Sequence, residues 1–301
     1  MAGKYRLYQV DSFTEEKFAG NPAGVITNAD GLTEFEMQKI ARELNNSETA
    51  FIFSSNCDEY DVHLRFFTPR KEVPICGHAT IAAHYVRALE NQLDTVRVIQ
   101  RTGAGLLPVD IIREKNDYRI IMTQGKIEFG SFIEGENKEI LLSALKITDE
   151  DLLGNCPIQI VSTGHSKVMI GIRNSTIINA LEPNYDALSK LSEIIGCNGY
   201  YVFTLNSGVD DILVKGRMFA PAIGINEDPV TGNANGPLGA YLVHHKLTEH
   251  NGALLRFNAR QGEAIRRAGT VNVEVRIEND EPAEVKVSGK AIIVFQTELI
   301  I

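Results

Sequence analysis

Two short motifs of one type, Gly77-His78-Ala79 and Gly232-Asn233-Ala234, each stand where a helix is predicted to begin. The first N–H groups of a helix have no partner within the helix, and with the helix dipole they amount to about half a positive charge. Small residues there let a ligand approach the backbone, so each motif could bind an anion. Two such helix starts acting on one ligand could hold a carboxylate. Ordinary helix caps in tight turns are the alternative.

Glu48 is a candidate general acid or base. It lies in Asn45-Asn46-Ser47-Glu48-Thr49-Ala50-Phe51, between the end of a predicted helix and an apolar strand. Burial at such an edge would raise the pKa of its carboxyl group toward neutrality, which suits a group that gives and takes protons. Its counterpart in the second half of the chain is Gly199. This asymmetry favours a catalytic role for Glu48, because a group needed for chemistry has to occur only once. The alternative is an exposed glutamate that only starts a strand.

Three further side chains adjoin the Gly-X-Ala motifs. His78 could titrate near pH 7 or donate a hydrogen bond to a substrate oxygen, or it could be a simple cap. Asp228 precedes Pro229, which keeps it extended and directs its carboxylate toward the second motif, unless it only forms an Asx-turn. Cys76 directly precedes the first motif, where a helix start could lower the pKa of its thiol. Thr231 takes the corresponding place in the second half, so the two thiols of a racemase are absent.

Several motifs recur in the same order in the two halves of the chain. The pairs are Arg65-Phe66-Phe67-Thr68-Pro69 with Arg217-Met218-Phe219-Ala220-Pro221, Cys76-Gly77-His78-Ala79 with Thr231-Gly232-Asn233-Ala234, Arg101-Thr102-Gly103 with Arg260-Gln261-Gly262, and Gln124-Gly125-Lys126 with Ser288-Gly289-Lys290. These matches predict two structurally similar halves with the active site between them.

The hydrophobic pattern predicts the elements that carry these motifs. Thr33 and Glu36 form the sequence of a capping box, followed by an apolar stripe of Phe35, Ile40, Ala41 and Leu44. The predicted helices are residues 34–44, about 78–90, about 185–195 and about 232–247, and the predicted strands of the first half are residues 5–10, 23–26, 50–53, 62–67 and 96–100.

The repeat also sets the expected domain boundaries. The first half should comprise residues 1–127, and the second half residues 128–291. A C-terminal strand at residues 292–301 could also belong to the first half. The segment from Ile127 to Pro157 is acidic and is expected to be a surface connector with two short helices.

Composition excludes several classes of protein. With 30 Lys and Arg against 39 Asp and Glu, the net charge of −9 is wrong for a binder of nucleic acid. No apolar run approaches the roughly 20 residues of a membrane span, and the first ten residues lack the apolar run of a secretory signal, so a cytoplasmic protein is expected. The four cysteines form no CxxC pair, and the sequence contains no complete dinucleotide or phosphate-binding motif, so we expect no metal and no cofactor.

The motifs together resemble the PhzF family of phenazine-biosynthesis-like isomerases over nearly the whole chain. The resemblance rests on Asp11-Ser12-Phe13, Gly20-Asn21-Pro22-Ala23, Asn46-Ser47-Glu48-Thr49-Ala50-Phe51, Cys76-Gly77-His78-Ala79-Thr80 and, most specifically, Glu227-Asp228-Pro229-Val230-Thr231-Gly232. It implies an α+β fold of the diaminopimelate-epimerase type, in which two pseudo-symmetric halves each curl a mainly antiparallel sheet around a central helix. It also implies a metal- and cofactor-independent isomerase that is commonly a homodimer.

The resemblance implies roles for single residues. In the family's best-understood member the substrate is trans-2,3-dihydro-3-hydroxyanthranilate, and a glutamate at the position of Glu48 moves a proton between carbons. His78 and Asp228 match the other catalytic positions, and Ser47 with the backbone at Gly77, Gly232 and Asn233 is expected to bind the substrate. The family usually continues Gly-Ser-Ala-His where this chain has Gly232-Asn233-Ala234-Asn235, so the substrate itself is not fixed by the resemblance.

The leading hypothesis is therefore a 1,3-shift of a proton on a small carboxylate, in which Glu48 collects the proton and returns it. One alternative on the same fold is an amino-acid epimerase or racemase with Cys76 as one base and a group such as Asp228 as the other. An alternative of another class is a non-catalytic sensor of small carboxylates. In a chain of net charge −9, the carboxylate should be held by local backbone dipoles and not by the overall field.

Overall fold

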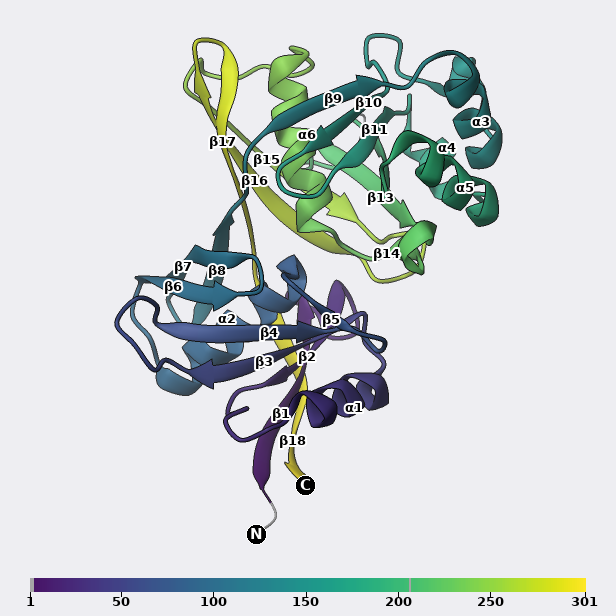
Figure 1. Ribbon diagram of the computed structural model, residues 1–301. Helices are drawn as coiled ribbons and strands as arrows, with labels where there is room; N and C mark the ends of the chain where they lie inside the picture. Colours follow the sequence, from purple (N-terminus) through teal and green to yellow (C-terminus); the bar gives the residue numbers. More distant parts are fainter. Residues whose placement is uncertain (1–2, 206) are drawn as a thin grey trace. The chain divides into compact units, whose positions relative to one another are not determined.

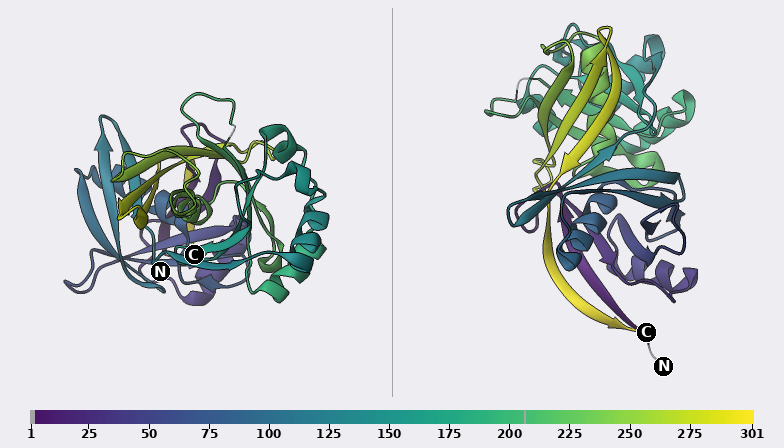
Figure 2. Two further views of the ribbon diagram at one scale, coloured as in Figure 1. Left: turned by 90° about the horizontal axis from the view of Figure 1, so that it is seen from above. Right: turned by 90° about the vertical axis from the view of Figure 1, so that its left-hand side faces the viewer.

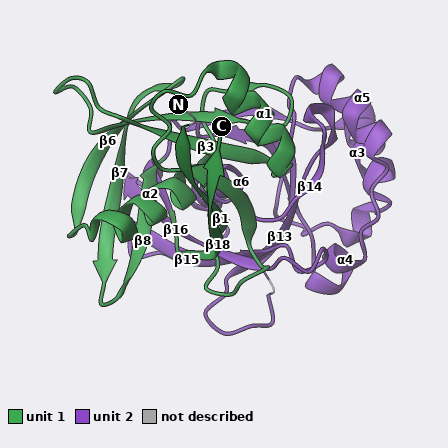
Figure 3. Cartoon of the chain, turned by 90° about the horizontal axis from the view of Figure 1, so that it is seen from below, with its two compact units in different colours: residues 1–123, 288–301 green, residues 124–287 purple. Residues whose placement is uncertain are grey.

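The computed structural model describes residues 3–205 and 207–301 (Figure 1). Met1 and Ala2, with which the first predicted half begins, and Asn206 lie outside the described residues. The chain divides into two compact units, which Figure 3 colours separately. Unit 1 consists of Met1–Thr123 and Ser288–Ile301, and unit 2 consists of Gln124–Val287.

The division differs by a few residues from the expected boundaries at 127 and 291. Gln124 N–H donates to Val285 O at 2.8 Å, and Gly125 N–H donates to Thr163 O at 2.9 Å. Both acceptors belong to unit 2, so the chain is tied to that unit before residue 128.

Unit 1 is a curled sheet around one buried helix. Helix α2 (Gly77–Asn91) contacts several of the surrounding strands, and it is buried on nearly all sides from His78 to Ala88, as a central helix must be. Its other elements are β1 (Lys4–Ser12), β2 (Asn21–Ile26), α1 (Glu34–Leu44), β3 (Glu48–Ser54), β4 (Val62–Phe67), β5 (Glu72–Val73), β6 (Val96–Thr102), β7 (Gly105–Glu114), β8 (Asp117–Thr123) and β18 (Ala291–Ile300).

The C-terminal strand belongs to unit 1. Strand β18 pairs antiparallel with β1 along its whole length, from Lys4 opposite Ile300 to Ser12 opposite Ala291. The two strands lie side by side in Figure 2.

Unit 2 has the same plan with an additional helical layer. Its central helix is α6 (Gly232–His244), which is buried almost throughout. The other elements are β9 (Glu128–Phe132), α3 (Gly135–Leu145), the 3₁₀ turn η1 (Asp149–Asp151), β10 (Gln159–Ser162), β11 (Lys167–Gly171), α4 (Ser175–Ala180), α5 (Tyr185–Ile195), β12 (Tyr200–Thr204), β13 (Val214–Ala220), η2 (Pro221–Ile223), β14 (Ile225–Asp228), β15 (Leu254–Gln261), β16 (Gly269–Glu278) and β17 (Glu281–Gly289), whose last two residues belong to unit 1.

The strand pairings confirm the repeat seen in the sequence. In unit 1, β2 pairs parallel with β3, β3 antiparallel with β4, and β4 parallel with β6. In unit 2, β11, β12, β13 and β15 pair in the same order and with the same directions. The mixed α+β fold with two similar halves is therefore as predicted, and the predicted strands and the capping box of Thr33 and Glu36 are confirmed.

Two local predictions about helices are wrong. Phe35 is not part of the buried stripe of α1, because its side chain is 70% exposed while Met37, Ile40 and Ala41 are buried. At 3.6 residues per turn these three share one face with Leu44, and Phe35 lies on the opposite face. Helix α6 ends at His244 instead of Leu247, whose N–H turns back to donate to Leu242 O at 2.9 Å.

The segment from Ile127 to Pro157 is not merely a surface connector. Strand β9 pairs with β10, and α3 contributes Leu141, Leu142, Ala144 and Leu145 to the core cluster of unit 2. Its acidic residues made it look like a linker, but its apolar residues cover one face of the unit 2 sheet together with α4 and α5.

No helix among the described residues is long and apolar enough to cross a membrane.

Candidate functional site

Glu48 is fixed at the first position of β3. The preceding helix α1 ends at Leu44, and the left-handed backbone of its C-cap residue Asn45 (φ 52°) turns the chain back within a few residues. Asn46 is then anchored to β1 by reciprocal amide hydrogen bonds with Gln9, of 3.1 and 2.8 Å. Because β2 pairs with β3 at Ala23 and Glu48, the carboxylate is held at a defined register. Its side chain is only 14% exposed.

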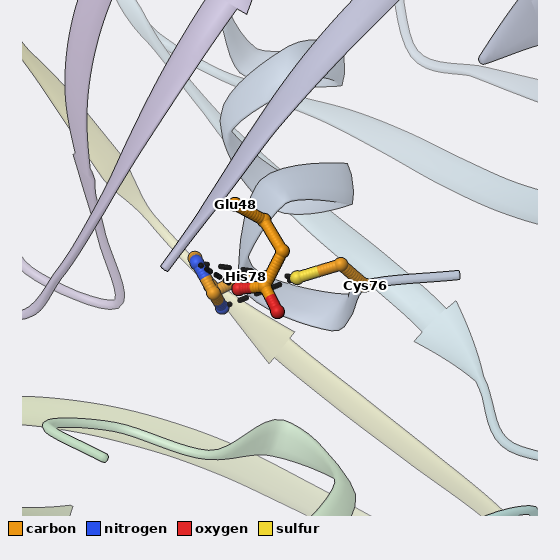
Figure 4. A group of neighbouring side chains, drawn as sticks. All are labelled: Glu48, Cys76 and His78. Carbon is orange, nitrogen blue, oxygen red and sulfur yellow. Dashed lines mark hydrogen bonds and ion pairs between the residues drawn. The ribbon is translucent and has the colours of Figure 1, made fainter. Parts of the chain in front are cut away.

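His78, at the start of α2, contacts the side chains of Glu48 and Cys76, which Figure 4 draws with it, and also that of Ser47. Its Nε2 lies 3.4 Å from Glu48 Oε2 and 3.2 Å from Ser47 Oγ, and its Nδ1 lies 3.4 Å from Cys76 Sγ. The imidazole is 8% exposed, and its backbone carbonyl accepts a hydrogen bond from Ser12 Oγ at 2.8 Å. This arrangement confines the ring, so its nitrogens face Glu48, Ser47 and Cys76.

The start of α2 is open to a ligand. Cys76, the N-cap residue, has extended backbone and makes no side-chain capping hydrogen bond, so it leaves the first N–H groups of the helix to other partners. A methyl group at Gly77 would meet no atom within 4 Å among the described residues. Glycine is therefore not required here by the packing of unit 1, and the free space lies beside a site that favours anions.

The same cluster offers ligands for a metal ion. One atom each from Glu48, Cys76 and His78 lies within 4.8 Å of the others, and carboxylate, thiolate and imidazole together form a set that zinc accepts. Sequence reasoning treated Cys76 separately from Glu48 and did not predict this proximity. Chemically, the three groups can exchange protons, stabilise a negative charge or bind a thiophilic cation.

Asp228 forms a second polar centre, in unit 2. Strand β14 ends at Asp228, and the hydroxyl of Thr231 donates to its Oδ2. Thr231 is the N-cap residue of α6 but makes no side-chain capping hydrogen bond to it, so this helix start is also left open. Gly232 and Asn233 are its first two residues. The start of α6 therefore matches the start of α2, as the repeat predicts: Thr231, Gly232 and Asn233 correspond to Cys76, Gly77 and His78.

A buried network behind Asp228 explains the unusual Asn235. Tyr201 donates to Asn235 Oδ1 at 2.5 Å, and Asn235 Nδ2 donates to Thr231 O and to Gln261 Oε1. Gln261 Nε2 donates in turn to Asp228 O at 2.8 Å. Burial raises the pKa of Tyr201, so its hydroxyl remains protonated and acts as a donor. Through these hydrogen bonds, the buried Asn235 stabilises the turn from Asp228 to Thr231.

The structure groups the predicted site residues by unit. Ser47, Glu48, Gly77 and His78 come together in unit 1, and Asp228, Gly232 and Asn233 follow one another at a single turn of unit 2. Sequence reasoning missed Gln261 as a supporting residue. The repeated Arg-X-Gly motif, in which Thr102 corresponds to Gln261, was the signal that could have found it.

The chain is similar to proteins named as isomerases over nearly its full length. It is 70% identical to an uncharacterised isomerase of Clostridium acetobutylicum, covering 100% of both chains. It is 31% identical to the trans-2,3-dihydro-3-hydroxyanthranilate isomerase of Pseudomonas chlororaphis, covering 94% of this chain and 95% of that one.

Solved structures of other proteins have the same fold. A PhzF-family phenazine biosynthesis protein of Bacillus anthracis matches with a TM-score of 0.89 and 31% identity, over 99% of this chain and 100% of that one. A hydroxyproline epimerase of Agrobacterium vitis shares the fold with a TM-score of 0.65 at 9% identity, over 99% and 91%. The model of the PhzC-PhzF family, described as phenazine biosynthesis-like protein, matches residues 10–297. The chain therefore belongs to the phenazine biosynthesis-like PhzC-PhzF family and is an isomerase.

Proposed function

We propose that the protein moves a proton from one carbon to another of a small carboxylate, as a 1,3-shift that needs no cofactor. The observation that carries the proposal is the position of Glu48, a mostly buried carboxylate 3.4 Å from His78 Nε2 and beside the open start of α2. A general base must reach a substrate proton, and a stabiliser must face the charge that develops when the proton leaves. Unit 1 supplies both within one cluster.

The proposed steps use only groups of the chain. Glu48 removes a proton from a carbon next to the conjugated system of the substrate. The N–H groups at the start of α2, with His78, stabilise the negative charge that spreads over the substrate. Glu48, now protonated, returns the proton to a second carbon on the same face. Ser47 Oγ, 3.2 Å from His78 Nε2, helps to hold the imidazole and contacts the substrate.

Unit 2 is proposed to contribute binding. The start of α6 at Gly232 and Asn233 would donate N–H groups to the substrate, and Asp228 would accept a hydrogen bond from it. The support for this is the repeat: both helix starts lack a side-chain cap, and Thr231 directs its hydroxyl to Asp228 instead. We further propose, from the family resemblance, a cytoplasmic homodimer that acts on a metabolite and neither on nucleic acid nor at a membrane.

Carbon-bound deuterium tests the proposed reaction. The wild-type protein would be incubated in D₂O with trans-2,3-dihydro-3-hydroxyanthranilate and a panel of small unsaturated carboxylates, and the products followed by proton NMR. We expect a shifted double bond for at least one compound, with deuterium on carbon only in the fraction in which the proton on Glu48 exchanges with D₂O before it is returned. Binding with neither a shifted double bond nor exchange across the whole panel would instead indicate a sensor.

One observation favours a second candidate, an epimerase. Cys76 Sγ lies 3.4 Å from His78 Nδ1, close enough for the imidazole to activate the thiol. Inversion also requires a base on the opposite face, and the counterpart of Cys76 is Thr231, whose hydroxyl is occupied by Asp228. Cys76→Ala should abolish an epimerase but leave the Glu48 reaction within about tenfold of wild type, the loss of one supporting contact. Inversion of a stereocentre by wild type and not by Cys76→Ala would support the epimerase.

Gly77→Ala should separate ligand binding from folding. Because the added methyl group meets open space, the free energy of unfolding should stay within about 1 kcal/mol of wild type. The methyl would nevertheless obstruct the N–H groups of α2, and loss of one charge-assisted hydrogen bond should weaken carboxylate binding by about tenfold or more. The measurements are urea unfolding and a binding titration.

Gly20→Ala is the matched control for that substitution. Gly20 has φ +60°, and a methyl group there would collide with Ser12 O, so the same change should destabilise unit 1. Unchanged ligand affinity in Gly77→Ala would remove the start of α2 from the binding site.

A further inference from the structure

One cluster of unit 1 brings together three side chains of the kinds that bind metal ions. Glu48 Oε2 lies 3.4 Å from His78 Nε2, and Cys76 Sγ lies 3.9 Å from the same nitrogen. One ligand atom of each residue lies within 4.8 Å of the other two. In residues 3–205 and 207–301, no other group of three or more histidine, cysteine, aspartate or glutamate side chains comes together so closely. All three belong to unit 1, so that unit alone forms the cluster.

The distances in the cluster are close to the edges of a tetrahedral zinc site. With bonds of about 2.0–2.2 Å to nitrogen and oxygen and about 2.3 Å to sulfur, a tetrahedron places the nitrogen about 3.4 Å from the oxygen and about 3.6 Å from the sulfur. The separations from His78 Nε2 are 3.4 Å to Glu48 and 3.9 Å to Cys76. Small side-chain rotations are therefore enough to give three protein ligands, and water can supply the fourth.

The secondary structure holds the three ligands in place. Cys76 and His78 flank Gly77 at the start of α2, and Glu48 is the first residue of β3. Cys76 and His78 are buried, and the side chain of Glu48 is 14% exposed. Side chains that are already confined lose little conformational entropy when a ligand binds, so this arrangement favours affinity for a cation.

The charges of the cluster also match a divalent cation. The carboxylate of Glu48 supplies one negative charge, and the thiol of Cys76 supplies a second when metal binding displaces its proton. Cys76 is the N-cap residue of α2, and the positive end of a helix favours the thiolate. His78 would bind as the neutral imidazole. Buried charges are unfavourable unless they are paired, and one divalent cation pairs with both anions.

The donor atoms select zinc over the hard cations. Mg²⁺ and Ca²⁺ are bound by oxygen ligands, whereas this cluster offers a sulfur and a nitrogen beside one carboxylate. Thiolate and imidazole are both ligands that suit Zn²⁺. The cation that fits is therefore Zn²⁺, and Co²⁺ can replace it as a spectroscopic probe.

We propose that Glu48, Cys76 and His78 form an inhibitory site for Zn²⁺. The inhibition rests on the proposed function, because a lone pair of Glu48 that binds zinc cannot accept a proton from carbon. The nitrogen of His78 that binds zinc likewise cannot stabilise charge on the substrate. Binding exchanges the thiol proton of Cys76 for the metal, and the proton passes to the buffer. Zinc is thus a reversible inhibitor of the reaction and not a cofactor for it.

A cobalt titration tests the site without reference to catalysis. The full chain, kept reduced and freed of metal with EDTA that is then removed, would be titrated with Co²⁺. Tetrahedral cobalt with a thiolate ligand gives a near-ultraviolet charge-transfer band and strong visible bands. Wild type should saturate at a one-to-one ratio, and Zn²⁺ but not Mg²⁺ should remove the spectrum. Glu48→Gln should weaken cobalt binding about tenfold or more, since loss of even an outer partner of a ligand costs about 10- to 100-fold.

Cysteine variants identify the thiolate. Cys76→Ser nearly keeps the shape of the side chain and should lose the charge-transfer band. Cys57→Ser, the same change at an exposed cysteine of unit 1, is the matched control and should keep the band. Absence of the band in wild type overturns the inference by itself, so the test does not depend on a variant that folds poorly. A band that survives in Cys76→Ser, or is lost in Cys57→Ser, also overturns it.

Turnover tests the inhibition. On the compound that wild type converts, saturating Zn²⁺ should lower turnover about tenfold or more, and EDTA should restore it. Cys76→Ser should need about tenfold more Zn²⁺ or a larger excess for the same inhibition, whereas Cys57→Ser should respond as wild type. Zinc binding that leaves turnover unchanged, or equal zinc sensitivity of Cys76→Ser, would overturn the inference.

Failure of the proposed function would be recognised separately. The one-to-one cobalt spectrum without conversion of any compound would support the metal site and contradict only the proposed function. Conversion without the cobalt spectrum would overturn the metal site and leave the proposed function intact.

Discussion

Glu48→Gln should reduce the turnover number about 10²- to 10⁴-fold, the usual contribution of a positioned general base. Glutamine has nearly the same shape and keeps an oxygen that can face His78 Nε2, 3.4 Å from the present carboxylate. Its amide, however, cannot accept a proton from carbon. The expected result is therefore a loss of kcat with little change in ligand affinity or in the free energy of unfolding.

The control for this variant is Glu43→Gln, which makes the same change at an exposed residue of α1. It should retain wild-type turnover. Turnover and affinity would be measured for both variants on the compound that wild type converts. Wild-type turnover by Glu48→Gln would exclude Glu48 as the base, and an equal loss in Glu43→Gln would show that the effect is not specific to the site.

Glu227→Ala should lower the free energy of unfolding by about 3–5 kcal/mol, because it leaves a buried guanidinium without its counter-charge. Arg217 donates to both carboxylate oxygens of Glu227, at 2.9 and 2.7 Å, and both side chains are 7% exposed. The remaining Nη1 donates to Ile178 O and Leu181 O. The guanidinium is therefore fixed in the core of unit 2 and cannot turn to water.

The repeat provides the matched variant, Glu72→Ala. Arg65, the counterpart of Arg217, binds Glu72 with similar geometry, at 2.7 and 2.6 Å, but the two side chains are 23% and 37% exposed. Arg65 keeps its second partner, Glu34 Oε2 at 2.9 Å from Nη2, and water can replace the lost carboxylate, so the expected loss is about 1 kcal/mol or less. Urea unfolding of both variants measures the difference. Equal losses would contradict the argument that burial decides the contribution of this ion pair.

Local sequence signals predicted most of the fold. Elements that depend only on neighbours in the chain are found where expected. They are the capping box at Thr33, the alternating strand from Val62 to Phe67 and the helix from Tyr185 to Ile195. The prediction that Phe35 belongs to the buried stripe of α1 was wrong, because an apolar side chain does not by itself identify the buried face of a helix. The prediction that the segment from Ile127 to Pro157 is a surface connector was wrong, because the burial of this segment depends on strands that are distant in the sequence.

The candidate site was predictable where chemistry and repeat coincide. Glu48, His78 and Gly77 stand out because polar or small residues interrupt apolar elements at their ends. The proximity of Cys76 Sγ to His78 Nδ1, by contrast, depends on side-chain orientation at the start of α2.

The most direct test of the central claim, that Glu48 carries one proton between two carbons, is the fate of a deuterium label. A substrate found in the panel, deuterated at the carbon that loses its proton, would be converted in ordinary water and the product examined by NMR at early times. Return by a single carboxyl group predicts product molecules with deuterium at the second carbon, and no such transfer by Glu48→Gln. Complete loss of the deuterium to water from the first turnover, or label transfer by Glu48→Gln at the wild-type rate, would contradict it.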